Sequence, residues 1–299
     1  MRFSSAIMRL SFWTGGAERR ENAVDDFDDL IERRFGERVE DVPTLARGEA
    51  VIRGLLDHRV IRRFSDRPVE AGLVRLLCAA ALSSPTKSDL QQGDILIVED
   101  AALRARMAAL LPDQPWIAGA PALLLFLGNN RRQRQIAEWR GKPFPNDHLD
   151  AFFNAAVDGA IVMATFIVAA EAVGLGCCPI STIRNHAQTV SDWCGLPAHV
   201  FPVAALGLGW PADPGHMSAR LPLTTRVHTN RFDESKVREE VDAYDRRRHA
   251  IFPYRQQRDE ARFGRADFYG WSEDKARQYA SPERADFGAY VRRRGFRLE

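Results

Sequence analysis

Cysteine is scarce in this sequence, and its spacing fits neither a disulfide framework nor a zinc site. The four cysteines are Cys78, Cys177, Cys178 and Cys194, and no two of them form a C-x-x-C pair. Small secreted domains are held together by many regularly spaced cysteines, which excludes that class here. A structural zinc site is equally unexpected. We interpret the cysteines as reduced core residues.

An excess of charge of one sign is also missing. The 42 Lys and Arg residues nearly balance the 40 Asp and Glu residues, which leaves a formal net charge of +2. A nucleic-acid binder needs a large basic field to compete for phosphates, so no nucleic-acid partner is expected.

Long apolar runs are absent as well. The longest, 159–170, is bounded by Asp158 and Glu171 and is far shorter than the ~20 residues that cross a bilayer. The N-terminus lacks the apolar stretch and cleavage site of a signal peptide. We therefore expect a soluble, cytoplasmic protein without a membrane partner.

Motifs for catalysis by side chains are missing too. The sequence contains no GxSxG, HExxH, P-loop or GxGxxG, and its seven histidines show no metal-ligand spacing. We expect no bound metal. A chemistry without nucleophile or metal fits a cofactor that performs the reaction itself.

The organisation that is present indicates one sizeable domain with extensions. Residues 1–46 are charge-rich and weakly patterned, and we interpret them as a mobile or surface-wrapping extension, with a short helix over 25–35 as the alternative. The regular pattern predicts a domain over 47–299, of which 231–299 form a charged C-terminal helical arm.

Hydrophobic periodicity predicts helices separated by buried strands. The expected helices are 49–57, 68–82, 101–111, 150–174 and 185–193, and the expected strands are 94–99, 121–128 and 201–208. The polar segment 131–145 contains two prolines and is expected to be a flap or a surface excursion. Helix 150–174 is apolar nearly all round, which predicts burial on every side. Together these elements suggest an α+β domain with one sheet.

Two basic segments are candidates for binding an anion. Arg59 and Arg62 lie three residues apart after a helix, so their guanidinium groups could converge on one phosphate. Arg220 lies in irregular backbone beside a proline, where anion sites are often found. Taken alone, each is explained as well or better by a solvated basic surface.

Two further segments could bind a flat polar ring. In 83–91, hydroxyl groups accompany Gln91, whose side chain has the donor and the acceptor that match an imide edge. Lys87 could face a developing anion. After Gly174 and Gly176, free N–H groups of 180–182 could point at a ligand. The alternatives are an ordinary helix-to-strand loop and a helix C-cap.

Four runs in a fixed order carry a family resemblance. They are AAEAVGLG, PISTIRN, LP..V.PVAALGLGWPAD and ARLP....VH. Over roughly residues 48 to 296 the sequence resembles the nitroreductase superfamily. Within it, the likeness is to the branch of oxygen-insensitive NADPH nitroreductases and NADPH–flavin reductases.

The resemblance implies a fold and an activity. The fold would be α+β, with a single mixed sheet flanked by helices and an interlocked homodimer whose long helix 150–174 lies at the interface. Two FMN sites would lie between the subunits. Hydride would pass from NADPH or NADH through flavin N5 to nitroaromatics, quinones or free flavin, in a ping-pong cycle.

The resemblance also implies site residues. For the phosphate and ribityl chain of FMN these are His58, Arg59, Val60, Arg62 and Arg220. For the flavin ring they are Ser83, Ser84, Pro85, Lys87, Asp89, Gln91, Ile180, Ser181 and Thr182. Arg184 would lie near the substrate, and Arg262 or Arg265 would meet the NADPH 2′-phosphate, unless their segment is simply a solvated helix.

The sequence departs from the family pattern at several of these positions. Val60 stands where serine is usual, Ser218 replaces a common lysine, and Ser181 and Thr182 replace two glycines. Asp89 replaces an asparagine, and an acid there would lower the flavin potential. Two alternatives therefore stay open: a flavoenzyme specialised for reductive dehalogenation or for oxidation of one metabolite, and a flavin-binding dimer without significant turnover.

Overall fold

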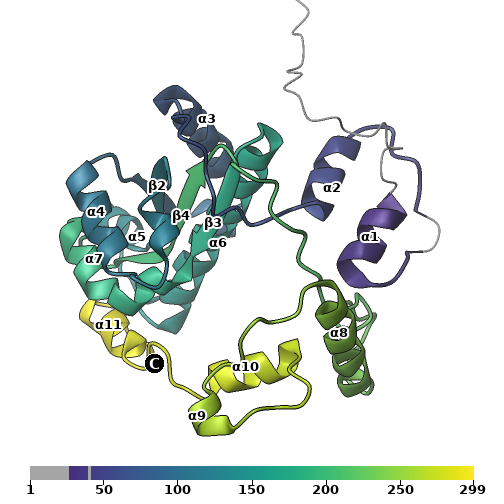
Figure 1. Ribbon diagram of the computed structural model, residues 1–299. Helices are drawn as coiled ribbons and strands as arrows, with labels where there is room; N and C mark the ends of the chain where they lie inside the picture. The colour runs from purple at the N-terminus through teal and green to yellow at the C-terminus, as the bar shows by residue number, and fades with distance from the viewer. Residues whose placement is uncertain (1–26, 40–41) are drawn as a thin grey trace, which may run out of the picture.

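A single four-stranded sheet forms the centre of the protein in the computed structural model, which describes residues 27–39 and 42–299 (Figure 1). Its strands are β1 (Gly93–Ile97), β2 (Ala122–Asn129), β3 (Gly176–Ile180) and β4 (Val200–Gly209), in the order β1-β2-β4-β3. All three pairings are antiparallel. The parallel part of the predicted mixed sheet is confined to an isolated bridge between Val60 and Cys177. The predicted α+β fold is confirmed.

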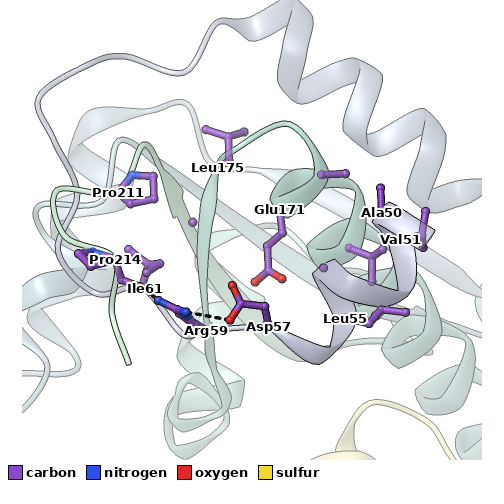
Figure 2. A pocket seen from close by; sticks show the side chains of 14 residues that line it. Ala50, Val51, Leu55, Asp57, Arg59, Ile61, Glu171, Leu175, Pro211 and Pro214 are labelled. Carbon is purple, nitrogen blue, oxygen red and sulfur yellow. Dashed lines mark hydrogen bonds and ion pairs between the residues drawn. The ribbon is translucent and has the colours of Figure 1, made fainter. Parts of the chain in front are cut away.

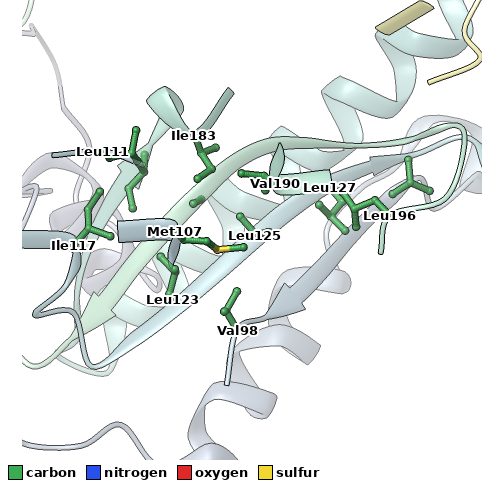
Figure 3. Packing of buried hydrophobic residues seen from close by; sticks show 13 residues of the cluster. Val98, Met107, Leu111, Ile117, Leu123, Leu125, Leu127, Ile183, Val190 and Leu196 are labelled. Carbon is green, nitrogen blue, oxygen red and sulfur yellow. The ribbon is translucent and has the colours of Figure 1, made fainter. Parts of the chain in front are cut away.

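The two middle strands consist of apolar residues on both faces because both faces are covered. Along β2, Leu123, Leu125 and Leu127 belong to one buried cluster, whereas Leu124 and Phe126 belong to the other. Figure 3 shows the first cluster, in which Met107 and Val190 lie with the β2 leucines. This alternation follows from the two-residue repeat of a strand.

The opposite face of the sheet is covered by α6 (Leu149–Ala172). Its buried side includes Phe166, whose ring meets that of Phe126 edge-on at 5.5 Å. The prediction of burial on every side is wrong for the single chain, because only one side of α6 meets the sheet and its neighbours. Phe153, 60% exposed, lies on the other side with Leu149 and Val157. Within the described part of the chain, α6 alone has the length and composition to cross a membrane.

Helices surround this core. They are α1 (Phe27–Phe35), α2 (Glu49–Leu56), α3 (Ala71–Leu82), α4 (Ala101–Ala109), α5 (Arg131–Trp139), α7 (Ala187–Trp193), α8 (Val237–Ile251), α9 (Glu260–Phe263), α10 (Trp271–Tyr279) and α11 (Phe287–Arg293). In Figure 1 the arm α8–α10 lies apart from the sheet, while α11 returns to it beside α7.

The structure corrects three details of the predicted helices. The expected flap over 131–145 contains α5, an amphipathic helix whose few apolar residues made it look like a loop. Helix α3 begins at Ala71 rather than Pro68, and its Leu76 is exposed. The apolar face of α2 is also exposed in the single chain.

The described part of the N-terminal extension is a packed helix. Helix α1 lies against α2 and buries Phe27, Leu30, Ile31 and Arg34, so the interpretation as a mobile arm is wrong for this part. The expectations for residues 1–26 and 40–41 lie outside the described residues.

Candidate functional site

After the turn at Asp57, the segment from Arg59 to Arg62 runs as an extended chain beside β3. Its backbone is fixed by the bridge between Val60 and Cys177 and by a 3.0 Å hydrogen bond from Ile61 N to Cys177 O. Because side chains alternate along an extended chain, Arg59 and Arg62 do not point the same way. Arg62 lies beside the Cys178 thiol, where burial raises the thiol pKa and Arg62 opposes that change.

Arg59 lines a cavity of about 430 Å³ between α2, the end of α6 and the loop after β4 (Figure 2). Its Nη2 donates to Asp57 Oδ1 at 2.8 Å, and its buried Nε has no hydrogen-bond partner. Nearby, His58 Nδ1 lies 2.7 Å from Glu171 Oε1. Both carboxylates of the cavity therefore have a cationic or imidazole partner, and the other walls are apolar.

A second arginine, Arg220, belongs to the same charged group. The pKa of Arg34, a buried arginine of α1, is lowered first by burial, next by Arg220 and also by Arg59, whereas Asp57 and Glu171 raise it. The Arg220 side chain donates a long hydrogen bond of 3.4 Å from Nη1 to Ala219 O. The positive charges of Arg220 and Arg59 both act on Arg34, and such an accumulation of charge favours an anion nearby.

This group fits a phosphate. Two buried arginine N–H groups here lack an acceptor, Arg59 Nε and the Nη1 of Arg247, the residue whose Nη2 donates to Arg220 O at 2.6 Å. A phosphate monoester supplies acceptor oxygens and negative charge to such groups. The residues therefore suit the phosphate end of a nucleotide-like cofactor.

The loop 83–91 lies at a different cavity, of about 250 Å³. Its lining includes Ser84, Pro85, Thr86 and Gln91 of the predicted loop, together with Asp158 of α6 and Arg132 of α5. Among the described residues, the two cavities share no lining residue, so one chain does not bring the loop and the arginines into a common cavity.

The buried carboxylate of Asp158 anchors this loop. It is 1% exposed and accepts hydrogen bonds from Thr86 Oγ1 at 2.6 Å, Lys87 N at 3.1 Å and Gln92 N at 3.0 Å. Sequence reasoning missed this role, although an acid in the middle of a largely apolar helix was a visible signal.

The anchored loop holds Gln91 in a restrained conformation. Ser88, Asp89 and Gln91 have left-handed φ angles of 49°, 57° and 51°, which are unfavourable for side-chain-bearing residues. Gln91 N donates to Thr86 Oγ1 at 2.8 Å, and Arg132 Nη1 donates to Gln91 O at 2.6 Å. The Gln91 side chain donates to Asp89 Oδ1 at 3.0 Å. Its backbone is thus fixed on both sides.

The other predicted ring-binding residues lie at opposite edges of the sheet, since Ser83 and Lys87 precede β1 whereas 180–182 stand at the end of β3. Ser83 Oγ donates to Ala79 O at 2.9 Å, and Lys87 Nζ lies 3.4 Å from Asp150 Oδ2. Ile180 is buried at the end of β3, and Ser181 follows it on the surface. Thr182 Oγ1 accepts a 2.6 Å hydrogen bond from Gln114 Nε2.

The predicted substrate and NADPH arginines lie elsewhere. Arg184 donates to Val203 O, and burial, followed by Arg284, lowers its pKa. Arg262 donates to Ala280 O at 3.1 Å and stacks on Phe263, and Arg265 is exposed. None of the three lines either cavity.

Residues 27–39 and 42–299 contain no group of three potential metal ligands.

Comparison with known proteins identifies this arrangement. The model of the nitroreductase family matches residues 55–210, and that of the nitroreductase family C-terminal domain matches 218–299. The chain belongs to the nitroreductase family. The first model covers the loop 83–91 and the segment at Arg59, and the second covers Arg220. Helix α1 lies outside both.

Characterised nitroreductase-family proteins resemble the chain over most of its length. It is 29% identical to "FMN reductase [NAD(P)H]" of Bacillus subtilis, over 83% of this chain and 98% of that protein. It is 35% identical to "Oxygen-insensitive NADPH nitroreductase" of Salmonella typhimurium, over 60% of this chain and 72% of that protein.

Solved structures of the family show the same fold. The NADPH:FMN oxidoreductase from Vibrio harveyi, complexed with NAD+, has a TM-score of 0.72 at 25% identity and covers 82% of this chain and 98% of its own. Nitroreductase A from Vibrio parahaemolyticus has a TM-score of 0.74 at 26% identity, and the match covers 83% of this chain and 98% of that protein.

Proposed function

We propose that this protein is an FMN-dependent oxidoreductase that takes hydride from NADPH or NADH and passes it to a nitroaromatic, a quinone or free flavin. Family membership supports this, and so do relatives named as FMN reductases and nitroreductases. The observation that carries it is the cluster of Arg34, Arg59 and Arg220 with an unpartnered buried N–H, which calls for a phosphate.

Each part of the chain has a role in this proposal. Arg59 and Arg220 hold the FMN phosphate, with His58, Val60 and Arg62 along the ribityl chain. The loop 83–91 and the backbone of 180–182 hold the ring. When bound, FMN supplies the two-electron hydride chemistry at N5. The protein contributes positioning and fixed hydrogen-bond donors.

A homodimer follows from the separation of the two cavities. In this proposal the loop 83–91 of one subunit covers the arginine cluster of the other, so that each FMN lies between two chains. The exposed apolar side of α6 supports this, because Leu149, Phe153 and Val157 leave a contiguous apolar face uncovered in the single chain. The dimer would act in the cytoplasm on small-molecule acceptors, with no membrane or nucleic-acid partner.

The deciding experiment is a visible spectrum of the purified protein, followed by anaerobic addition of NADPH. We expect flavin absorbance that NADPH bleaches rapidly. A pure, dimeric sample that stays colourless and takes up no added FMN would overturn the proposal.

The preference for NADPH is tested separately. In this proposal Arg262 or Arg265 contacts the 2′-phosphate of NADPH. Arg262→Ala or Arg265→Ala is therefore expected to lower kcat/KM for NADPH about tenfold and to leave kcat/KM for NADH unchanged. An unchanged preference in both variants rejects this role.

A specialised flavoenzyme is the second candidate. Thr182 and Ser181 carry side chains at the proposed ring site, and Thr182 is held by Gln114. These side chains would restrict which acceptor fits, in favour of reductive dehalogenation or oxidation of a single metabolite. A panel of quinones and nitroarenes separates the candidates, because a generalist reduces most of them. A flavin-binding dimer without turnover would bind FMN but would not be bleached by NADPH.

A further inference from the structure

Arg34 of the N-terminal helix α1 joins two segments that are distant in sequence. Its Nε and Nη2 donate to Leu56 O at 3.0 and 2.8 Å, and Nη2 also donates to His58 O at 2.6 Å. On the other side its Nη1 donates to Ser218 O at 3.1 Å. Arg34 is only 4% exposed. Its guanidinium group therefore connects the backbone before Arg59 to the backbone before Arg220.

The same helix end fixes the backbone of Arg220. Arg220 N donates to Arg34 O at 2.6 Å, and its carbonyl accepts from Arg247 Nη2 at 2.6 Å. Gly36, with a φ of 75°, allows Arg247 to pass, because a Cβ at this position would collide with the Arg247 side chain. Glu37 accepts a hydrogen bond from Leu223 N, a second link to the same segment.

The charge of Arg34 is not neutralised by these contacts. Its four hydrogen bonds go to three acceptors, all of them neutral carbonyl oxygens. The two nearby carboxylates have other partners, since Asp57 binds Arg59 and Glu171 binds His58. A buried cation is costly unless an opposite charge offsets it, so this group gains stability when an anion enters.

We infer that Arg34 is a positioning residue of the flavin phosphate site, supplied by a helix that lies outside both family models. It orders Arg59 and Arg220 around one phosphate monoester, and it restores the positive charge that Ser218 leaves out where a lysine was expected. This inference rests on the proposed function, because it requires FMN to be the ligand.

Comparing FMN with riboflavin tests the inference directly, because riboflavin lacks the phosphate. Kd for both is measured by fluorescence titration of the apoprotein. For Arg34→Gln we expect Kd for FMN to rise about tenfold, in line with the loss of a charge-assisted contact, and Kd for riboflavin to stay within about twofold. Arg38 is an exposed arginine that pairs with Glu32. Arg38→Gln is therefore the matched control and should change neither the Kd for FMN nor the Kd for riboflavin.

Two further variants keep the result decisive. Arg34→Lys keeps the charge and loses the planar fork of the guanidinium group. We therefore expect the affinity for FMN to fall about threefold and the affinity for riboflavin to stay unchanged. This variant provides the test if Arg34→Gln does not fold. Ser218→Lys in the Arg34→Gln background should recover most of the FMN affinity.

Each outcome separates the inference from the proposed function. Equal weakening of FMN and riboflavin, or no recovery by Ser218→Lys, would overturn the role of Arg34 at the phosphate. A wild-type protein that binds neither flavin would instead overturn the proposed function itself.

Discussion

Asp158 shows how one buried side chain can determine the shape of a binding loop. Its carboxylate accepts three hydrogen bonds from the loop 83–92, and the loop in turn holds Gln91 at a positive φ. The conformation of Gln91 therefore depends on a residue of the central helix.

We expect Asp158→Asn to weaken FMN binding about tenfold. Asparagine has one oxygen and adds an N–H donor, so at least one loop donor loses its acceptor, at a cost of ~1–3 kcal/mol. Fluorescence titration gives the FMN affinity, and urea unfolding gives the stability. Asp192→Asn, on the exposed side of α7 and bound to Gln188, is the control. Unchanged FMN affinity in Asp158→Asn contradicts the anchoring role.

Asp89 affects the chemistry through its charge. Its carboxylate accepts from the side chain of Gln91, which we propose faces the flavin ring. A negative charge there opposes charge build-up on the reduced flavin, so Asp89→Asn should raise the midpoint potential of bound FMN. Spectroelectrochemical titration measures this, with Asp113→Asn on an exposed loop as control. A lower or equal potential would argue against proximity to the ring.

The sequence reveals some of these residues and hides others for a physical reason. Arg59 and Gln91 lie in short local motifs, so their residue types and spacing were informative. Asp158 and Arg34 act on backbone that lies far away along the chain, 71 residues in the case of the hydrogen bond from Lys87 N to Asp158. Local patterns carry no information about such contacts, which only the folded chain brings together.

Element by element, the prediction succeeded where periodicity was strong. Strands β1, β2 and β4 were found from apolar runs, and α6 from its length. Strand β3 was not among the expected strands because Pro179 interrupts its apolar pattern. Helix α5 was missed because polar residues dominate it, and the exposed side of α6 could not be recognised because its residues are as apolar as the buried side.

The C-terminal arm should lose stability at alkaline pH. Burial raises the pKa of Tyr254 to about 12, with nearby Asp274 adding to the effect. An unfolded tyrosine ionises near pH ~10, so between about pH 10 and 12 the folded state holds a proton that the unfolded state has lost. Stability is therefore complete below pH ~10 and falls as pH rises through this window.

Tyr254→Phe removes this ionisation. The slope of stability against pH above pH ~10 should become shallower than in the wild type, which urea unfolding monitored by circular dichroism at several pH values measures. Tyr279→Phe, at a position 86% exposed, is the matched control and should leave the slope unchanged. An identical slope in Tyr254→Phe and wild type would mean that other groups govern alkaline unfolding.

At the scale of the whole molecule, a single chain leaves its proposed site in two parts. The arginine cluster and the loop 83–91 line separate cavities, and large apolar side chains lie exposed along α2 and α6. Both observations have one explanation if a second copy covers the α6 face and brings its own loop to the arginines. Assembly and cofactor binding should then depend on each other.

Phe153→Glu tests this dependence. Phe153 is 60% exposed on the apolar side of α6, so in a dimer the new carboxylate would be buried without a partner, at a cost of several kcal/mol. We expect sedimentation to show monomers, and FMN affinity to fall by at least tenfold because each site loses the partner's loop. Tyr279→Glu, at an exposed position of α10, should remain dimeric with bound FMN. A Phe153→Glu monomer that still binds FMN as tightly as the wild type would show that one chain holds the whole site.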